Sequence, residues 1–160
     1  MLRSRITPCL LISDGALVKT QNFDSPKYVG DPINAVKIFN EKGADELIVL
    51  DIGATRKSLS PNFKLIQKLA AECRMPLCYG GGVNSAEFAS KLVDIGVEKV
   101  AVSSAAITNP KLINEMTSAV GRQSVVVVID FNKKKNFFSN EYEPCSHHGK
   151  KIYKDDQFLF

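Results

Sequence analysis

The sequence lacks several features that would direct it to a membrane or to an oxidising compartment. No apolar run approaches the roughly 20 residues that cross a bilayer, so we expect no membrane association. The four cysteines include no CxxC pair, and the apolar run near the N-terminus is too short for a signal peptide. These absences favour a protein of the reducing cytoplasm.

Signals for a metal or a nucleic acid are also weak. Cys145, His147 and His148 lie close together in the tail, but three such ligands without a fourth rarely form a zinc site. We expect no metal and no other cofactor. Residues 131–160 hold six lysines against four acids, which is +2 of the total net charge of +4. So small a surplus is typical of a solvated loop, and we expect no nucleic-acid partner.

Five short apolar runs alternate with helical patterns in the first 130 residues. Continuous rather than alternating hydrophobicity indicates a parallel sheet buried on both faces, and therefore an α/β fold. The pattern stops after the fifth run, so we expect one domain over residues 1–130 and a basic tail over residues 131–160. The expected strands are Arg5–Ile12, Glu46–Asp51, Pro76–Tyr79, Lys99–Ser103 and Ser124–Asp130.

The expected helices have recognisable ends. Three start at a polar cap followed by proline, which needs no hydrogen-bond partner at the first helical position. A fourth starts at a variant capping box, and three glycines mark helix stops. The caps are Asp31, Ser60, Asn84 (with Glu87) and Asn109, and the stops are Gly43, Gly96 and Gly121.

Two architectures fit this alternation of strands and helices. One is part of a TIM barrel, a (β/α)8 fold that needs eight units and roughly 250 residues. The chain would then form about four units plus a fifth strand, a half barrel. The other is a complete doubly wound sheet of flavodoxin-like type. Periodicity alone does not separate them.

In both architectures the ligand site lies at the carboxyl ends of the strands. Glycine lets backbone N–H groups approach an anion closely, and the start of the next helix favours negative charge. A phosphate site between the third and fourth strands is therefore expected. An aspartate that closes a run of β-branched residues must be paired, hydrated or used. The candidates at the strand ends are Asp51, Gly80, Gly81, Gly82, Ser103, Ser104 and Asp130.

Longer segments carry a specific resemblance. MLRSRITPCLLISDGALVKTQNF, GDPINAVKIFNEKGADELIVLDI, PLCYGGGV, GVEKVAVSSAAITNP and SVVVVID together resemble the cyclase subunit of imidazole glycerol phosphate synthase, from Met1 to Asp130 almost without gaps. This resemblance implies the (β/α)8 barrel. It also implies a lyase of histidine biosynthesis that reacts ammonia from a glutaminase partner with a phosphorylated ribonucleotide-like substrate. The products are imidazole glycerol phosphate and an aminoimidazole carboxamide ribotide.

The resemblance implies two catalytic aspartates, at the ends of the first and fifth strands. Asp130 occupies the second position, but Leu11 occupies the first. Leucine transfers no proton, and losing a general acid or base typically costs on the order of 10²–10⁴ in rate. Asp14 lies nearby but matches another aspartate of the family. Impaired ring closure is therefore expected.

Other positions match family sites. The resemblance implies that one set binds substrate or phosphate, with Lys19 on a mobile loop after the first strand. It implies that a second set forms a charged ammonia gate at the amino-terminal face, where the glutaminase docks. The first set is Lys19, Asp51, Gly81, Gly82, Ser103 and Ser104, and the second is Arg5, Glu46 and Lys99.

Leu11, together with the segments GALVKT and GDPINAVKIFNEK, most resembles a side branch of the family that is linked to surface-polysaccharide synthesis. Those paralogs are thought to supply ammonia for modifying an amino sugar, which is one alternative function. The other is a non-catalytic fragment that dimerises or binds a partner, since a half barrel leaves its first and fifth strands as open edges. The tail is expected to start with a hairpin that places Phe137, Phe138 and Tyr142 on one side.

Overall fold

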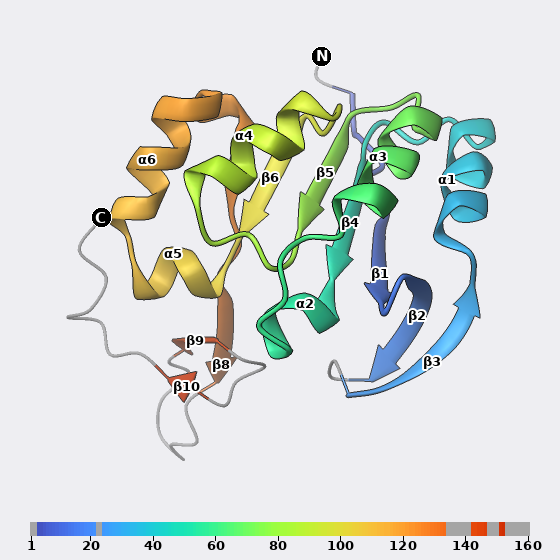
Figure 1. Cartoon of the computed structure of the whole chain (residues 1–160). Helices are drawn as coiled ribbons and strands as arrows, with labels where there is room; N and C mark the ends of the chain where they lie inside the picture. Colours follow the sequence, from blue (N-terminus) through green and yellow to red (C-terminus); the bar gives the residue numbers. More distant parts are fainter. Residues whose placement is uncertain (1–2, 22–23, 134–141, 147–150, 153–160) are drawn as a thin grey trace.

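A computed structural model describes residues 3–21, 24–133, 142–146 and 151–152. Within these ranges, no helix has both the length and the apolar character needed to cross a membrane. The expected α/β fold is present, with a main sheet, a layer of helices and a small second sheet (Figure 1).

Seven strands form the main sheet in the order β3-β2-β1-β4-β5-β6-β7. Five of them run parallel and follow the chain order from β1 to β7. The parallel strands are β1 (Cys9–Ser13), β4 (Leu47–Asp51), β5 (Leu77–Gly80), β6 (Lys99–Val102) and β7 (Val125–Val127).

Four longer helices cover one face of the sheet (Figure 1). They are α1 (Pro32–Glu41), α3 (Phe63–Glu72), α4 (Ala86–Asp94) and α6 (Lys111–Val120). In β4, Leu47 and Val49 belong to the core beneath these helices and are fully buried. Ile48 and Leu50 point to the other face and are only partly buried. The expectation of burial on both faces therefore holds for β5, where all four residues are buried, and for most of β6, but not for β4, whose second face is only partly buried.

Strand order decides between the two architectures. A flavodoxin-like sheet has the order 2-1-3-4-5, with helices on both faces. Here each parallel strand lies beside its predecessor, as in a barrel wall. The described strands do not close, because β3 and β7 are the two edges of the sheet. The chain thus forms part of a (β/α) barrel, as expected.

The first strand is not an open edge, contrary to expectation. An antiparallel ribbon of β2 (Ala16–Gln21) and β3 (Asp24–Gly30) follows it, and β2 pairs with β1. The segment was expected to be a loop because the family resemblance implied one. The edge at β7 is present as expected.

The fifth strand is shorter than expected. It ends at Val127, and Asp130 instead begins β8 (Asp130–Lys133) of a second, antiparallel sheet. That strand pairs with β9 (Tyr142–Ser146), which also pairs with β10 (Lys151–Ile152). The expected hairpin is therefore present. Tyr142 is exposed, while Phe137 and Phe138 lie outside the described residues.

The helix stops were predicted better than the caps. Gly43, Gly96 and Gly121 each follow a helix with positive φ, where glycine is favoured. Asp31 caps α1 as expected, but α3 is capped by Asn62 and α4 by Ser85, two and one residues later than predicted. Helix α6 begins after Pro110 without a side-chain cap, so Asn109 does not play the expected role.

Three short helical segments were not expected. They are α2 (Ile52–Arg56), α5 (Ser104–Thr108) and η1 (Arg122–Ser124). Each spans about one turn, which is too short for an apolar repeat to be visible in the sequence. Helices α2 and α5 directly follow β4 and β6, so they lie at the carboxyl ends of the strands (Figure 1).

We predict that Asp31→Ala destabilises the protein through the start of α1. The Asp31 carboxylate accepts hydrogen bonds from the backbone N–H groups of Ile33 and Asn34, at 2.8 and 3.1 Å. Losing such a cap costs about 1 kcal/mol, so urea denaturation should show a lower midpoint. Asp31→Asn keeps an accepting oxygen and should stay close to the unaltered chain. Equal midpoints for Asp31→Ala and the unaltered chain would contradict this role.

Candidate functional site

A cavity of about 350 Å³ lies at the carboxyl ends of β4, β5 and β6. It is large enough for a small ligand or for one end of a larger one. Six of the residues predicted for catalysis or phosphate binding line it, although they come from four separate chain segments. These residues are Asp51, Gly81, Gly82, Ser103, Ser104 and Asp130.

The glycine turn after β5 lies directly against the end of β4. Gly81 has φ +122°, and a Cβ atom there would lie 2.4 Å from the backbone oxygen of Asp51. Gly82 has φ +69°, and its Cβ atom would lie 2.5 Å from the backbone oxygen of Leu59. A side chain at either position would overlap with backbone. The turn therefore requires glycine for packing, independently of any ligand.

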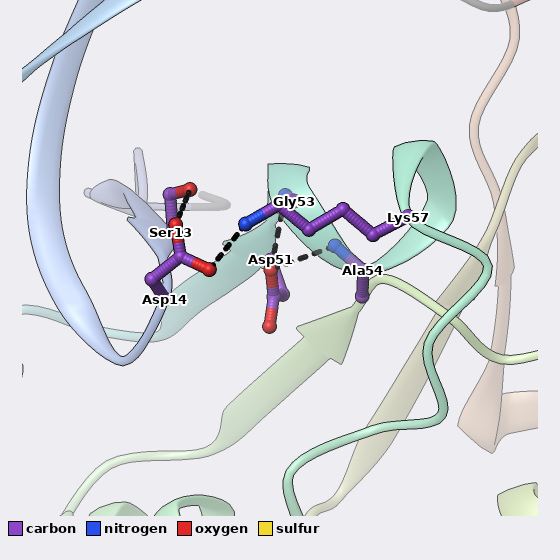
Figure 2. Close-up of polar contacts among 6 residues, drawn as sticks. All are labelled: Ser13, Asp14, Asp51, Gly53, Ala54 and Lys57. Atoms are coloured by element: carbon purple, nitrogen blue, oxygen red, sulfur yellow. Dashed lines mark hydrogen bonds and ion pairs between the residues drawn. The ribbon is translucent and has the colours of Figure 1, made fainter.

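Asp51 closes β4 and caps the next helix. Its Oδ1 atom accepts hydrogen bonds from the N–H groups of Gly53 and Ala54, both at 3.0 Å (Figure 2). Burial raises the pKa of Asp51, and these two hydrogen bonds partly oppose the increase. Asp51 is thus both a structural cap, one of the interpretations considered for it, and a carboxyl group that lines the cavity.

Two serines and a second aspartate line the cavity from β6 and β8. Ser103 precedes the short helix α5 without capping it through its side chain, and Ser104 is the first residue of that helix. Asp130 begins β8, where its register partner is Cys145. The second sheet, rather than the end of the fifth parallel strand, therefore carries this carboxylate to the cavity.

The turn between β1 and β2 forms a separate polar cluster. Lys57, just after α2, forms an ion pair with Asp14, and the Ser13 hydroxyl donates to the same carboxylate at 3.5 Å (Figure 2). The hydrogen bond from Lys57 lowers the pKa of Asp14. Asp14 does not line the cavity, and its carboxylate is already paired with Lys57.

Leu11 and Lys19 are not among the residues that line the cavity. Leu11 is partly buried and pairs in register with Leu50, whose side of the sheet borders the cavity. Lys19 is on β2, not on a loop as expected, and its register partner on β3 is Lys27. Two like charges directly opposite each other disfavour the ribbon. The substrate-binding role of Lys19 stays a prediction.

At the opposite end of the strands, the three predicted gate residues meet. Glu46 Oε1 lies 3.0 Å from Arg5 Nη2 and also forms an ion pair with Lys99. The hydrogen bond from Lys99 lowers the pKa of Glu46, although partial burial opposes the effect. Arg5 precedes β1, Glu46 precedes β4 and Lys99 begins β6. These positions are far apart in the sequence, and the pairing of the strands brings them together.

Sequence reasoning missed several polar residues of the cavity. Arg56, Ser58 and Asn84 all line it. Ser58 has φ +52°, which is rare for a residue with a side chain. Arg56 and Ser58 follow β4 within and just after α2. Because α2 shows no periodic signal, nothing in the sequence indicated which of these residues turn toward the strand ends.

Together, the fold and the site define a partial (β/α) barrel with a polar, glycine-lined cavity at the carboxyl ends of its strands. Residues 5–153 match the family described as histidine biosynthesis protein. The chain belongs to this TIM-barrel family, as its segments had suggested.

Individual relatives agree with this assignment. A "Putative imidazole glycerol phosphate synthase subunit HisF" of Leptospira borgpetersenii is 56% identical over 151 residues, covering 94% of this chain and 59% of that protein. A "Putative imidazole glycerol phosphate synthase subunit hisF3" of Vibrio vulnificus is 50% identical over 160 residues, covering 100% and 61%. An "Imidazole glycerol phosphate synthase subunit HisF" of Bacillus cereus is 42% identical over 133 residues, covering 83% and 53%. The chain thus spans about half to three-fifths of the length of these relatives.

We predict that Gly81→Ala destabilises the chain and disturbs the cavity. The added Cβ atom overlaps with the Asp51 backbone oxygen at a φ that alanine rarely adopts, which costs roughly 1–3 kcal/mol. Urea denaturation measures the loss. Gly43→Ala is the control, because Gly43 also has positive φ but open space around it. If both variants lose equal stability, the close contact at Gly81 contributes nothing beyond backbone strain.

We predict that Glu46→Gln changes the pH dependence of stability. The pKa of Glu46 is lower in the folded chain than its ordinary value. Its stabilisation is therefore complete above the ordinary glutamate pKa of about 4.3 and is lost as pH falls through the lower folded value. Replacing this carboxylate in a partly exposed ion-pair cluster should cost up to about 1 kcal/mol at pH 7. Urea denaturation at pH 7 and in acid measures both effects; a pH-independent difference would contradict the lowered pKa.

Proposed function

We propose that the chain provides the phosphate-binding part of an ammonia-dependent active site of the cyclase-subunit type. The observation that supports this most is the single cavity that gathers Asp51, the glycine turn, Ser103, Ser104 and Asp130. Backbone N–H groups of a glycine turn and serine hydroxyls are donors that suit a phosphate. The cavity volume suits one phosphorylated end of a ribonucleotide-like substrate.

Two carboxyl groups with different surroundings are available for proton transfer. Asp51 is partly buried and held by two backbone N–H groups, while Asp130 reaches the cavity from β8. Paired carboxyl groups in distinct environments can divide the roles of acid and base. Because Leu11 replaces the aspartate of the resembling family, we propose that ring closure to imidazole glycerol phosphate is slow in this chain.

Ammonia would enter from the opposite end of the strands. The Arg5–Glu46–Lys99 cluster lies at their amino-terminal end, where its charges compensate one another to leave a net charge of +1. A cluster of fixed, paired charges can frame a passage for a neutral molecule. We propose that a glutaminase subunit docks at this end and releases ammonia there, in the cytoplasm.

Leu11 favours a second candidate function, the supply of ammonia for modifying an amino sugar in surface-polysaccharide synthesis. A catalytic aspartate is not needed at this position if no imidazole ring is closed. Sequence identity does not separate the two candidates, because relatives named HisF without a number range from 41% to 56% identical, and those named hisF3 and hisF2 are 50% and 53% identical.

Ammonia-dependent turnover of the histidine-pathway substrate by the purified chain tests these proposals. We predict that Leu11→Asp raises the rate on the order of 10²-fold by restoring a proton-transferring group, whereas Leu11→Asn, of similar size, does not. Partial burial of Leu11 should allow both variants to fold. Asp130→Asn should remove the gain. Calorimetric binding of the same substrate to the unaltered chain is measured alongside.

Each alternative outcome has a defined meaning. Turnover by the unaltered chain at an ordinary enzymatic rate, of about 1–10³ s⁻¹, would show that Leu11 does not limit ring closure. Equal rates for Leu11→Asp and Leu11→Asn would contradict the proton-transfer argument. Absence of substrate binding would contradict the phosphate-binding role of the cavity itself.

A further inference from the structure

Helix α2 presents two faces to two different parts of the molecule. Gly53 and Lys57 lie four residues apart, on one face of the helical turn. A Cβ atom on Gly53 would lie 3.1 Å from Ser13 Oγ, and Lys57 pairs with Asp14, so this face meets the turn between β1 and β2 (Figure 2).

Other residues of α2 meet the cavity. Ile52, Ala54 and Arg56 line it at the end of β4, whereas Gly53 and Lys57 do not. The contacts of Gly53 and Lys57 fix how the helix is rotated, and the two hydrogen bonds to Asp51 fix where it begins. Arg56 therefore lies at the cavity because of where α2 is placed, and not because of its own sequence context.

The position of Arg56 matters because the cavity also contains acidic residues. Asp51 and Asp130 contribute carboxyl groups, and among the described lining residues Arg56 is the one with a cationic side chain. A phosphate that enters beside ionised carboxylates is repelled unless a cation lies near it. Helix α5 is too short to offset this repulsion. Backbone N–H groups donate hydrogen bonds but carry no net charge.

We propose that Arg56 is a binding residue for the phosphate group of the substrate. This inference rests on the proposed function, because it specifies how the same cavity accepts an anion. The guanidinium group would donate two hydrogen bonds to the phosphate from the β4 side, opposite Ser103 and Ser104 on the β6 side. The glycine turn after β5 lies between these two sides, so the anion would be held from three adjacent strands.

Calorimetric titration of the full chain with ribose 5-phosphate and with inorganic phosphate tests this inference. Arg56→Ala should weaken the affinity for both by about tenfold or more, because it removes a charged, two-bond contact. Arg56→Lys keeps the positive charge but loses the planar guanidinium group. Its affinity should therefore lie between those of the unaltered chain and Arg56→Ala. Arg74→Ala is the matched control. It removes the same type of side chain from an exposed position before β5, at the opposite end of the strands from the cavity, and should change the affinity by no more than about twofold.

The outcomes separate this inference from the function on which it rests. If the unaltered chain binds ribose 5-phosphate and Arg56→Ala binds equally well, Arg56 has no role and the cavity still binds phosphate. If Arg74→Ala weakens binding as much as Arg56→Ala, general surface charge explains the effect and the inference is overturned. If the unaltered chain binds neither probe, the proposed function and the inference both fail. Urea midpoints equal to that of the unaltered chain confirm that all three variants are folded.

Discussion

The close contact between the end of β4 and the glycine turn after β5 is the constraint on which the site depends. Gly80 fits between Leu50 and Ala101, and Gly81 touches the backbone of Asp51, at distances that exclude any side chain. This contact fixes the end of β5 against the end of β4, and Gly80 packs against Ala101 of β6. It therefore decides where Asp51, the glycine N–H groups and the serines after β6 lie. The cavity is the space that remains above these three strand ends.

Two groups of polar residues lie at opposite ends of the strands of the main sheet. Hydrogen-bond donors and carboxyl groups lie around the cavity at the carboxyl ends of the strands, where α2 and α5 begin. Compensated charges gather at the amino-terminal ends, where Glu46 joins Arg5 and Lys99. Parallel strands create this division, because all of them present equivalent ends to the same side.

Periodicity was sufficient where a helix or strand is long and apolar. It predicted α1, α3, α4 and α6 and the positions of β4, β5 and β6, with errors of one or two residues at caps such as Asn62 and Ser85. It failed where hydrogen bonding rather than burial forms the element. The β2–β3 ribbon is partly exposed, and α2 is held by the Asp51 carboxylate within one turn. Asp130 was expected to end a parallel strand because Val125–Ile129 is uniformly apolar, yet pairing with β9 decides its place.

The sequence by itself determined the alternating β/α pattern, the family resemblance and the identity of the groups at the strand ends, including Leu11 in place of an aspartate. These are local properties, readable from residue type and spacing. Only the tertiary structure decided that the sheet is singly wound, that β2 and β3 cover the first strand, and that Arg56 rather than Lys57 lines the cavity. The reason is physical. Which side of a short helix faces a cavity depends on contacts with residues distant in sequence, here Ser13 and Asp14 against Gly53 and Lys57, and no local pattern encodes them.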